Sequence, residues 1–133
     1  MLLRRLGGLS LVLGVAAAPI LTMAESETYR QGERLFRDQC SGCHSLEPGI
    51  HRAGPSLDGL MNRPAGSLDD FPYSQAMHDA THRWTPETLD RFLADPETLV
   101  PGTAMVFWGL DEASREQVIH YLETATLPDD SAE

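Results

Sequence analysis

Five consecutive residues, Cys40-Ser41-Gly42-Cys43-His44, combine two thiols and an imidazole at a spacing suited to chemistry. Thiols three positions apart on one turn can both form thioethers to one edge of a porphyrin, while the adjacent imidazole turns under the ring to ligate iron. C-x-x-C-H is the sequence signal for covalent attachment of a c-type haem. The chain has only these two cysteines, so the attachment leaves no thiol for a disulfide. We therefore expect one haem c, bound through Cys40 and Cys43, with His44 as an iron ligand.

Two other kinds of site also use a C-x-x-C pair. A thioredoxin-like redox pair follows a strand of a βαβ unit, but residues 34–39 have a helical pattern instead. A zinc site usually needs a second Cys or His pair at ligand spacing. The remaining histidines are scattered, and we assign them surface or structural roles: His51, His78, His82 and His120. The redox pair and the zinc site stay as alternatives to the haem.

Iron held by His44 needs a ligand on its other side, and methionine sulfur is one candidate. We expect Met61 and Met77 to fill the core, which is the usual place of methionine in a small domain. Met105 differs because it follows Val100-Pro101-Gly102-Thr103-Ala104, a stretch that Pro and Gly prevent from continuing as a helix. Such a loop is rigid, and a soft thioether donor needs a preset position to hold iron.

The N-terminus has the pattern of a secretory signal peptide. Arg4 and Arg5 are followed by an apolar, small-residue run over residues 6–21 and by a small-x-small cleavage site at Thr22-Met23-Ala24. We expect residues 1–24 to be cleaved and residues 25–133 to form a monohaem domain in the periplasm, because this kind of haem attachment takes place beyond the membrane. An uncleaved membrane anchor is the alternative, since residues 6–23 approach the length of a spanning helix.

The chain after residue 24 is strongly acidic and contains no lysine. Eight arginines stand against twenty Asp and Glu residues, which gives a formal charge of −12. Such a charge argues against binding to nucleic acid or to an anionic membrane surface, and it favours redox partner proteins with a basic docking face. Solubility alone is the other explanation of the acidity. We expect a monomer that meets the membrane only through a membrane-bound redox partner.

Three segments have a helical pattern and none reads as alternating strands, which predicts an all-α fold. The first segment covers residues 29–39 and leads into the haem motif. The second lies between its N-cap, Thr85, and the pair Asp95-Pro96. The third begins after its N-cap, Asp111, and stops at Pro128. Segments rich in Gly, Pro and Ser lie between the helices and are expected to wrap the cofactor as loops.

Motifs along the chain, from Gly32 to about Thr126, resemble those of the class I c-type cytochromes. In order they are Gly32 and Phe36, C-S-G-C-H, Gly54-Pro55-Ser56-Leu57, Gly59-Leu60, Arg63, Ala65-Gly66, Phe71-x-Tyr73-Ser74, Trp84, Pro101-Gly102-Thr103-x-Met105-x-Phe107 and Tyr121-Leu122. The resemblance implies the small class I cytochrome c fold, in which helices and loops wrap around one covalent haem c.

The resemblance also implies roles for the site residues. Met105 would be the distal iron ligand opposite His44, and the Pro55 carbonyl would accept a hydrogen bond from the other ring nitrogen of His44. Phe107 would shield the exposed haem edge. A buried haem propionate would be held by four polar side chains: Arg63, Tyr73, Trp84 and Thr103. Close approach of the first and last helices would involve Gly32, Phe36 and Tyr121.

The chain departs from the pattern of the family in several places, and three of these departures bear on function. Phe92 stands where the family often has a tyrosine near the methionine sulfur, Trp108 stands where the mitochondrial form has a small residue, and the basic docking ring is missing. We expect a soluble periplasmic carrier, not an enzyme, that shuttles single electrons between respiratory or dehydrogenase partners. The alternative is a haem peroxidase or small-gas sensor in which Met105 is displaced. Phe92 favours this alternative because it cannot donate a hydrogen bond to the sulfur.

Overall fold

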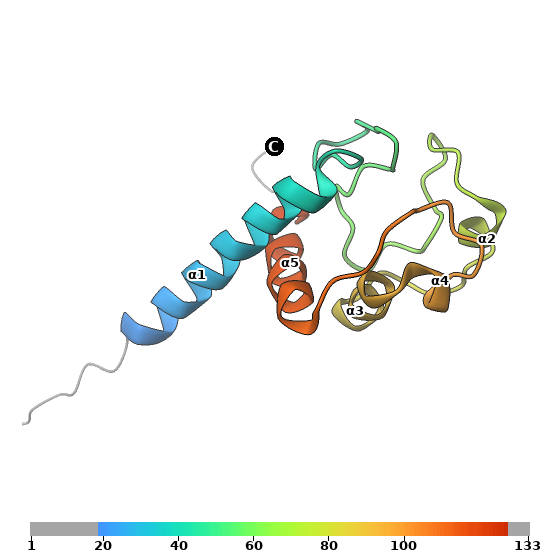
Figure 1. Ribbon diagram of the computed structural model, residues 1–133. Helices are drawn as coiled ribbons and strands as arrows, with labels where there is room; N and C mark the ends of the chain where they lie inside the picture. The colour runs from blue at the N-terminus through green and yellow to red at the C-terminus, as the bar shows by residue number, and fades with distance from the viewer. Residues whose placement is uncertain (1–18, 128–133) are drawn as a thin grey trace, which may run out of the picture.

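The computed structural model describes residues 19–127, which form helices joined by long loops (Figure 1). The elements, in chain order, are α1 (Pro19–Leu35), the π-helical turn η1 (Phe36–Cys40), α2 (Gln75–His78), α3 (Pro86–Ala94), α4 (Pro96–Leu99) and α5 (Glu112–Ala125). Within residues 19–127 extended backbone pairs only at one isolated bridge, between Pro64 and Arg83. The predicted all-α class is confirmed. No helix in this part of the chain is long and apolar enough to span a bilayer.

The crossing of α1 and α5 is the main helix packing of the molecule, and the remaining helices and loops lie to one side of it (Figure 1). Gly32 of α1 allows the close approach, because a Cβ at this position would lie 2.7 Å from the Tyr121 Cβ of α5. The Tyr121 ring packs between Tyr29 and Phe36, at centroid distances of 5.2 and 5.6 Å. The expected meeting of Gly32, Phe36 and Tyr121 is confirmed.

The N-terminal helix differs in its bounds from the helix predicted over residues 29–39. It is already helical at Pro19, the first described residue, and runs without a break through the predicted cleavage position at Ala24. Its α-helical part ends at Leu35, where the backbone widens into the π-helical turn η1. The wider turn is closed by a hydrogen bond of 2.9 Å from Ser41 N to Phe36 O. Residues 1–18 of the predicted signal peptide lie outside the described residues.

The two other predicted helices are confirmed, together with their caps. The Thr85 side chain accepts a hydrogen bond from Thr88 N at the start of α3, and the Asp111 side chain accepts one from Ser114 N at the start of α5. Both helices turn an apolar face to the core, which on α3 includes the buried Phe92. The four-residue helices α2 and α4 were not predicted, because one turn is too short to show a helical period.

Candidate haem site

The C-x-x-C-H motif forms one tight turn at the end of η1. The backbone carbonyl of Cys40 accepts hydrogen bonds from Cys43 N at 3.0 Å and from His44 N at 2.9 Å. Burial, and to a lesser degree the neighbouring Cys43, raises the pKa of the Cys40 thiol to about 11. A catalytic redox cysteine needs a lowered pKa, so the raised pKa of Cys40 argues against a thioredoxin-like pair.

The His44 imidazole is held in one orientation by the loop that follows the motif. Its Nδ1 lies 2.8 Å from the backbone oxygen of Pro55, and a carbonyl can only accept, so Nδ1 carries the proton. Nε2 is then left with its lone pair. Burial lowers the pKa of His44, and the positive charge of Arg63 lowers it further, whereas the hydrogen bond to Pro55 acts in the opposite direction. The imidazole is therefore neutral at pH 7, which is the form that binds iron.

Gly54 packs directly against the His44 ring. A Cβ at this position would lie 2.8 Å from Nδ1 and 2.9 Å from Nε2 of His44, closer than real Cβ contacts. The Gly54 amide also donates to the Cys43 carbonyl at 2.7 Å, which fixes the loop against the motif. The pair Gly54-Pro55 thus positions His44 through both steric contact and a hydrogen bond.

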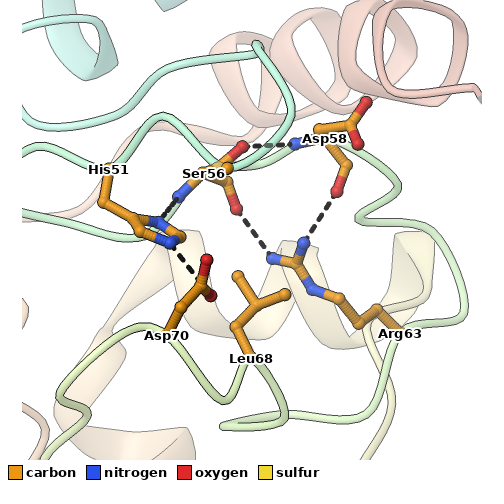
Figure 2. A pocket seen from close by; sticks show the side chains of 7 residues that line it. His51, Ser56, Asp58, Arg63, Leu68 and Asp70 are labelled. Carbon is orange, nitrogen blue, oxygen red and sulfur yellow. Dashed lines mark hydrogen bonds and ion pairs between the residues drawn. The ribbon is translucent and has the colours of Figure 1, made fainter.

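Arg63 lies in a polar cavity of about 70 Å³ between the loops that follow the haem motif (Figure 2). Its guanidinium donates to the Asp58 carbonyl at 2.7 Å and to the Ser56 carbonyl at 3.0 Å. Its Nε is buried and has no hydrogen-bond partner in the described structure. Buried polar groups normally find a partner. An N–H of a guanidinium in this position suits an anionic group such as a haem propionate.

His51 and Asp70 close the same cavity. His51 Nδ1 accepts a hydrogen bond of 2.9 Å from Ser56 N, and its Nε2 lies 3.0 Å from the Asp70 carboxylate (Figure 2). The structural role expected for His51 is therefore confirmed. Sequence reasoning missed Asp70, because no local pattern marks a contact that spans nineteen residues. Ser56 belongs to one of the family-like motifs in the sequence, but it contacts Arg63 and His51 through its backbone. The type of its side chain therefore could not predict these contacts.

Tyr73 and Trp84 differ in burial. Trp84 is buried and packs edge-on against Phe92 at 5.0 Å and His82 at 4.6 Å between ring centroids. Tyr73 is half-buried, and burial raises the pKa of its hydroxyl while the positive charge of Arg63 opposes the rise. Tyr73 packs edge-on against Phe71, with 5.0 Å between ring centroids, whereas Trp84 joins the core next to α3.

Met105 lies on a loop that its backbone contacts fix. Thr103 N donates to the Val100 carbonyl at 3.0 Å, and the Thr103 hydroxyl accepts from Met105 N at 3.3 Å. Gly102 has a φ of +89°, a conformation that favours glycine. The Met105 and Phe107 side chains are half-buried and pack against the core. Met77 is buried in this core, as predicted for a filler residue, and Met61 is partly buried against it, as Met105 is.

The ligands of a zinc site do not come together in residues 19–127. This part of the chain holds no group of three or more His, Cys, Asp and Glu side chains that could bind a metal ion. Three features, by contrast, fit the expected haem: the C-x-x-C-H turn, the neutral His44 imidazole and the unpartnered Nε of Arg63. Fold and site together define a small all-α protein with a covalent c-type haem.

Comparison with known proteins identifies the family. The sequence model described as cytochrome c matches residues 29–126, and the chain belongs to the cytochrome c family. It is 43% identical to cytochrome c-type cyt cy of Rhodobacter capsulatus over 96 residues, which cover 71% of this chain and 48% of the relative. It is 36% identical to cytochrome c2 of Blastochloris viridis over 114 residues, which cover 84% of this chain and 86% of the relative.

A third relative is cytochrome c of Chlamydomonas reinhardtii, 40% identical over 98 residues that cover 72% of this chain and 88% of the relative. The chain thus spans about half the length of the Rhodobacter capsulatus relative and most of the other two. The predicted class I c-type cytochrome is confirmed. The protein is an electron-transfer haem protein with one covalently attached haem c, and it is not an enzyme.

Proposed function

We propose that the protein is a soluble periplasmic carrier of single electrons, in which His44 and Met105 hold the haem iron from opposite sides. The observation that carries this proposal is the orientation of His44, with Nδ1 on the Pro55 carbonyl and its ring against Gly54. Nε2 is thereby presented as the donor atom in a fixed direction. When bound, the haem supplies reversible one-electron chemistry, and burial with a Met ligand gives a positive potential.

The proposed distal role of Met105 is supported by its loop. A thioether binds iron weakly, so the donor must be held in place by the protein. Thr103 fixes the backbone next to Met105, and Phe107 packs inward two residues further on. With His44 and Met105 as ligands on both sides, the iron would have no open position for a substrate. Buried Phe92 supplies no hydrogen bond to the sulfur, so Thr103 and the loop backbone have to hold Met105 without it.

The other predicted site residues would receive the propionate and shield the haem edge. The unpartnered Nε of Arg63 supports a role in balancing the propionate charge, and Tyr73 lies within its electrostatic influence. Trp84 and Thr103 are proposed to complete the hydrogen bonds to the propionate. Phe107 is proposed to cover the haem edge through which electrons pass.

Replacement of the distal ligand tests the proposed function. Met105→Ala should keep the haem covalently bound through Cys40 and Cys43, but should lose the weak far-red absorption of a sulfur-ligated ferric haem and lower the reduction potential. Met77→Ala is the matched control, because it removes a buried methionine of the core. It should reduce stability by about 2–5 kcal/mol and leave the far-red band in place. A Met105→Ala protein with unchanged spectrum and potential would show that another residue is the ligand.

We also propose that residues 1–24 are a cleaved secretory signal and that residues 25–133 form one domain in the periplasm. We propose that this domain is a monomer and that its redox partners have a basic docking face. The basic, apolar and small-residue segments of the N-terminus support the signal. Mass spectrometry of the protein from the periplasmic fraction should give a mature chain that begins at Glu25 and carries one haem. A full-length chain in the membrane fraction would instead support the uncleaved anchor.

A further inference from the structure

The loop from Ala104 to Trp108 presents its side chains alternately to the two sides of the chain. Met105 and Phe107 are half-buried and pack against the core, whereas Ala104, Val106 and Trp108 are exposed. Val106 is 87% exposed and Trp108 is 97% exposed. This is the period of two that extended backbone imposes on its side chains. This short segment therefore has an inward face, which carries the proposed iron ligand Met105, and an outward face that is entirely apolar.

The backbone contacts at both ends of this segment hold the outward face in place. After Trp108, Gly109 has a φ of +84°, and its position allows no Cβ because of the Ala94 backbone. The next amide, of Leu110, donates to the Leu93 carbonyl at 2.9 Å. Before the segment, the Gly102 amide donates to the Glu97 carboxylate at 3.0 Å. The exposure of Trp108 thus follows from the fold and not from a loose chain end.

Carboxylates border both ends of the same segment. Four exposed acidic residues lie on the chain that leads into the loop or out of it: Asp95, Glu97, Asp111 and Glu112. The neighbouring helices carry two arginines, the exposed Arg91 of α3 and Arg115 of α5, and Arg115 is paired with Asp90 at 2.7 Å. Along the chain, the apolar strip is therefore flanked mainly by acidic residues, and Glu97 is tied to the loop through Gly102.

We propose that Trp108 is the apolar anchor through which this protein binds its redox partner, with the exposed Ala104 and Val106 completing the apolar contact. The partner would be a protein whose complementary surface is an apolar recess with Arg or Lys residues around it. Tryptophan is enriched among the few residues that dominate binding energy at interfaces, and charged rims steer association. A second copy of this chain fits poorly, because its acidic border would repel the same border on the first copy.

This proposal rests on the proposed electron-carrier function, and it explains where the partner approaches. Docking on the outward face places the partner beside Met105 and Phe107, the half-buried chain neighbours of Val106 that pack against the core. Electron transfer needs such close approach to the haem edge without a change in the iron ligands. The bulky residue that departs from the family pattern, Trp108, thereby receives a role in recognition.

The test measures oxidation of the reduced, haem-loaded protein by membrane vesicles of the source organism. For Trp108→Ala we expect KM to rise at least about tenfold, as for an interface anchor, and kcat to stay unchanged. The ratio of the variant's KM to the KM of the unmodified protein should be the same at low and at high salt. Trp108→Phe should recover most of the affinity. Leu127→Ala is the matched control, because Leu127 is 60% exposed but follows the opposite end of α5. It should leave KM unchanged.

A second readout does not depend on turnover. With 5-fluorotryptophan in place of tryptophan, the two tryptophans give two fluorine signals, and Trp84 is buried. The Trp108 signal should shift or broaden when vesicles are added, and the Trp84 signal should not. An unchanged KM in Trp108→Ala, an equal loss in Leu127→Ala, or a dimer that depends on Trp108 would overturn the docking role. If neither the vesicles nor the soluble periplasmic fraction oxidises or reduces the unmodified protein, the carrier function fails, and the docking role with it.

Discussion

At the scale of single residues, the chemistry depends on how tightly neighbours hold His44. The imidazole has a Pro55 carbonyl on one nitrogen and Gly54 against its ring. A methyl group at Gly54 would have to displace the ring or the backbone that donates to the Cys43 carbonyl. The orientation of His44, the proposed iron ligand, therefore depends on the absence of a side chain at Gly54.

The prediction at this scale is that Gly54→Ala destabilises the haem-loaded protein by about 1–3 kcal/mol, the usual penalty of overpacking. Urea unfolding and the haem absorption spectrum measure the effect, and the spectrum should report altered histidine ligation. Gly42→Ala is the matched control, since a Cβ at Gly42 would meet nothing within 4 Å. Equal stability of the two variants would contradict the role of Gly54.

At the scale of elements, the α1–α5 crossing joins the two ends of the described chain. Gly32 lets α1 approach Tyr121 of α5, and the Gln117 side chain donates to that of Gln31 at 2.7 Å across the same interface. The same crossing places Phe36 of η1, the turn that ends at the first cysteine of the haem motif, against Tyr121 of the helix that comes after the Met105 loop. Helix packing thereby links the two segments that carry the proposed iron ligands.

We predict that Gly32→Ala lowers stability although alanine is the better helix former by about 1 kcal/mol. The new Cβ would lie 2.8 Å from the Gln117 carbonyl carbon and 2.7 Å from the Tyr121 Cβ. A net loss of about 1–3 kcal/mol in urea unfolding is expected from overpacking. Ser26→Ala, at an exposed position of the same helix, should be neutral or slightly stabilising. A stabilised Gly32→Ala variant would mean that the helices do not meet as described.

At the scale of the whole molecule, contacts between distant loops close the structure around the site. His51 connects the loop after the haem motif with Asp70, which lies shortly before α2, and it also accepts from Ser56 N beside the Arg63 cavity. The hydrogen bond from His51 lowers the pKa of the Asp70 carboxyl below its ordinary value of 3.8. The ionised carboxylate is therefore preferred in the folded state.

This contact predicts a contribution to acid stability. A lowered carboxyl pKa stabilises the fold fully above the ordinary pKa of 3.8, and the contribution is lost as the pH falls through the lower folded pKa. Asp70→Asn should therefore lower the urea midpoint at pH 6, and its difference from the unmodified protein should shrink as the pH approaches 3. Asp69→Asn, at the exposed neighbouring position, is the control. A difference that grows toward low pH would contradict the sign of the effect.

Part of the fold could be predicted because its signals are local. The Thr85 and Asp111 caps and the apolar faces that follow them predicted α3 and α5. The part of α1 described before Tyr29 was not predicted as part of this helix, since it has no capping or periodic signal. The helices α2 and α4 are single turns that are set by their surroundings and by the side-chain caps Ser74 and Asp95.

By itself, the sequence determined the covalent haem motif, the family, the helical class and the acidic charge, because each of these depends on neighbouring residues or on composition. Only the tertiary structure decided that Gly54 packs on His44, that Ser56 and Asp58 carbonyls hold Arg63, and that Trp108 faces outward while Phe107 faces inward. These contacts join atoms far apart in the chain or depend on which side of an extended backbone the core lies. No local pattern of residue types specifies such long-range contacts or the side of the backbone that faces the core. Both are determined only when the whole chain folds.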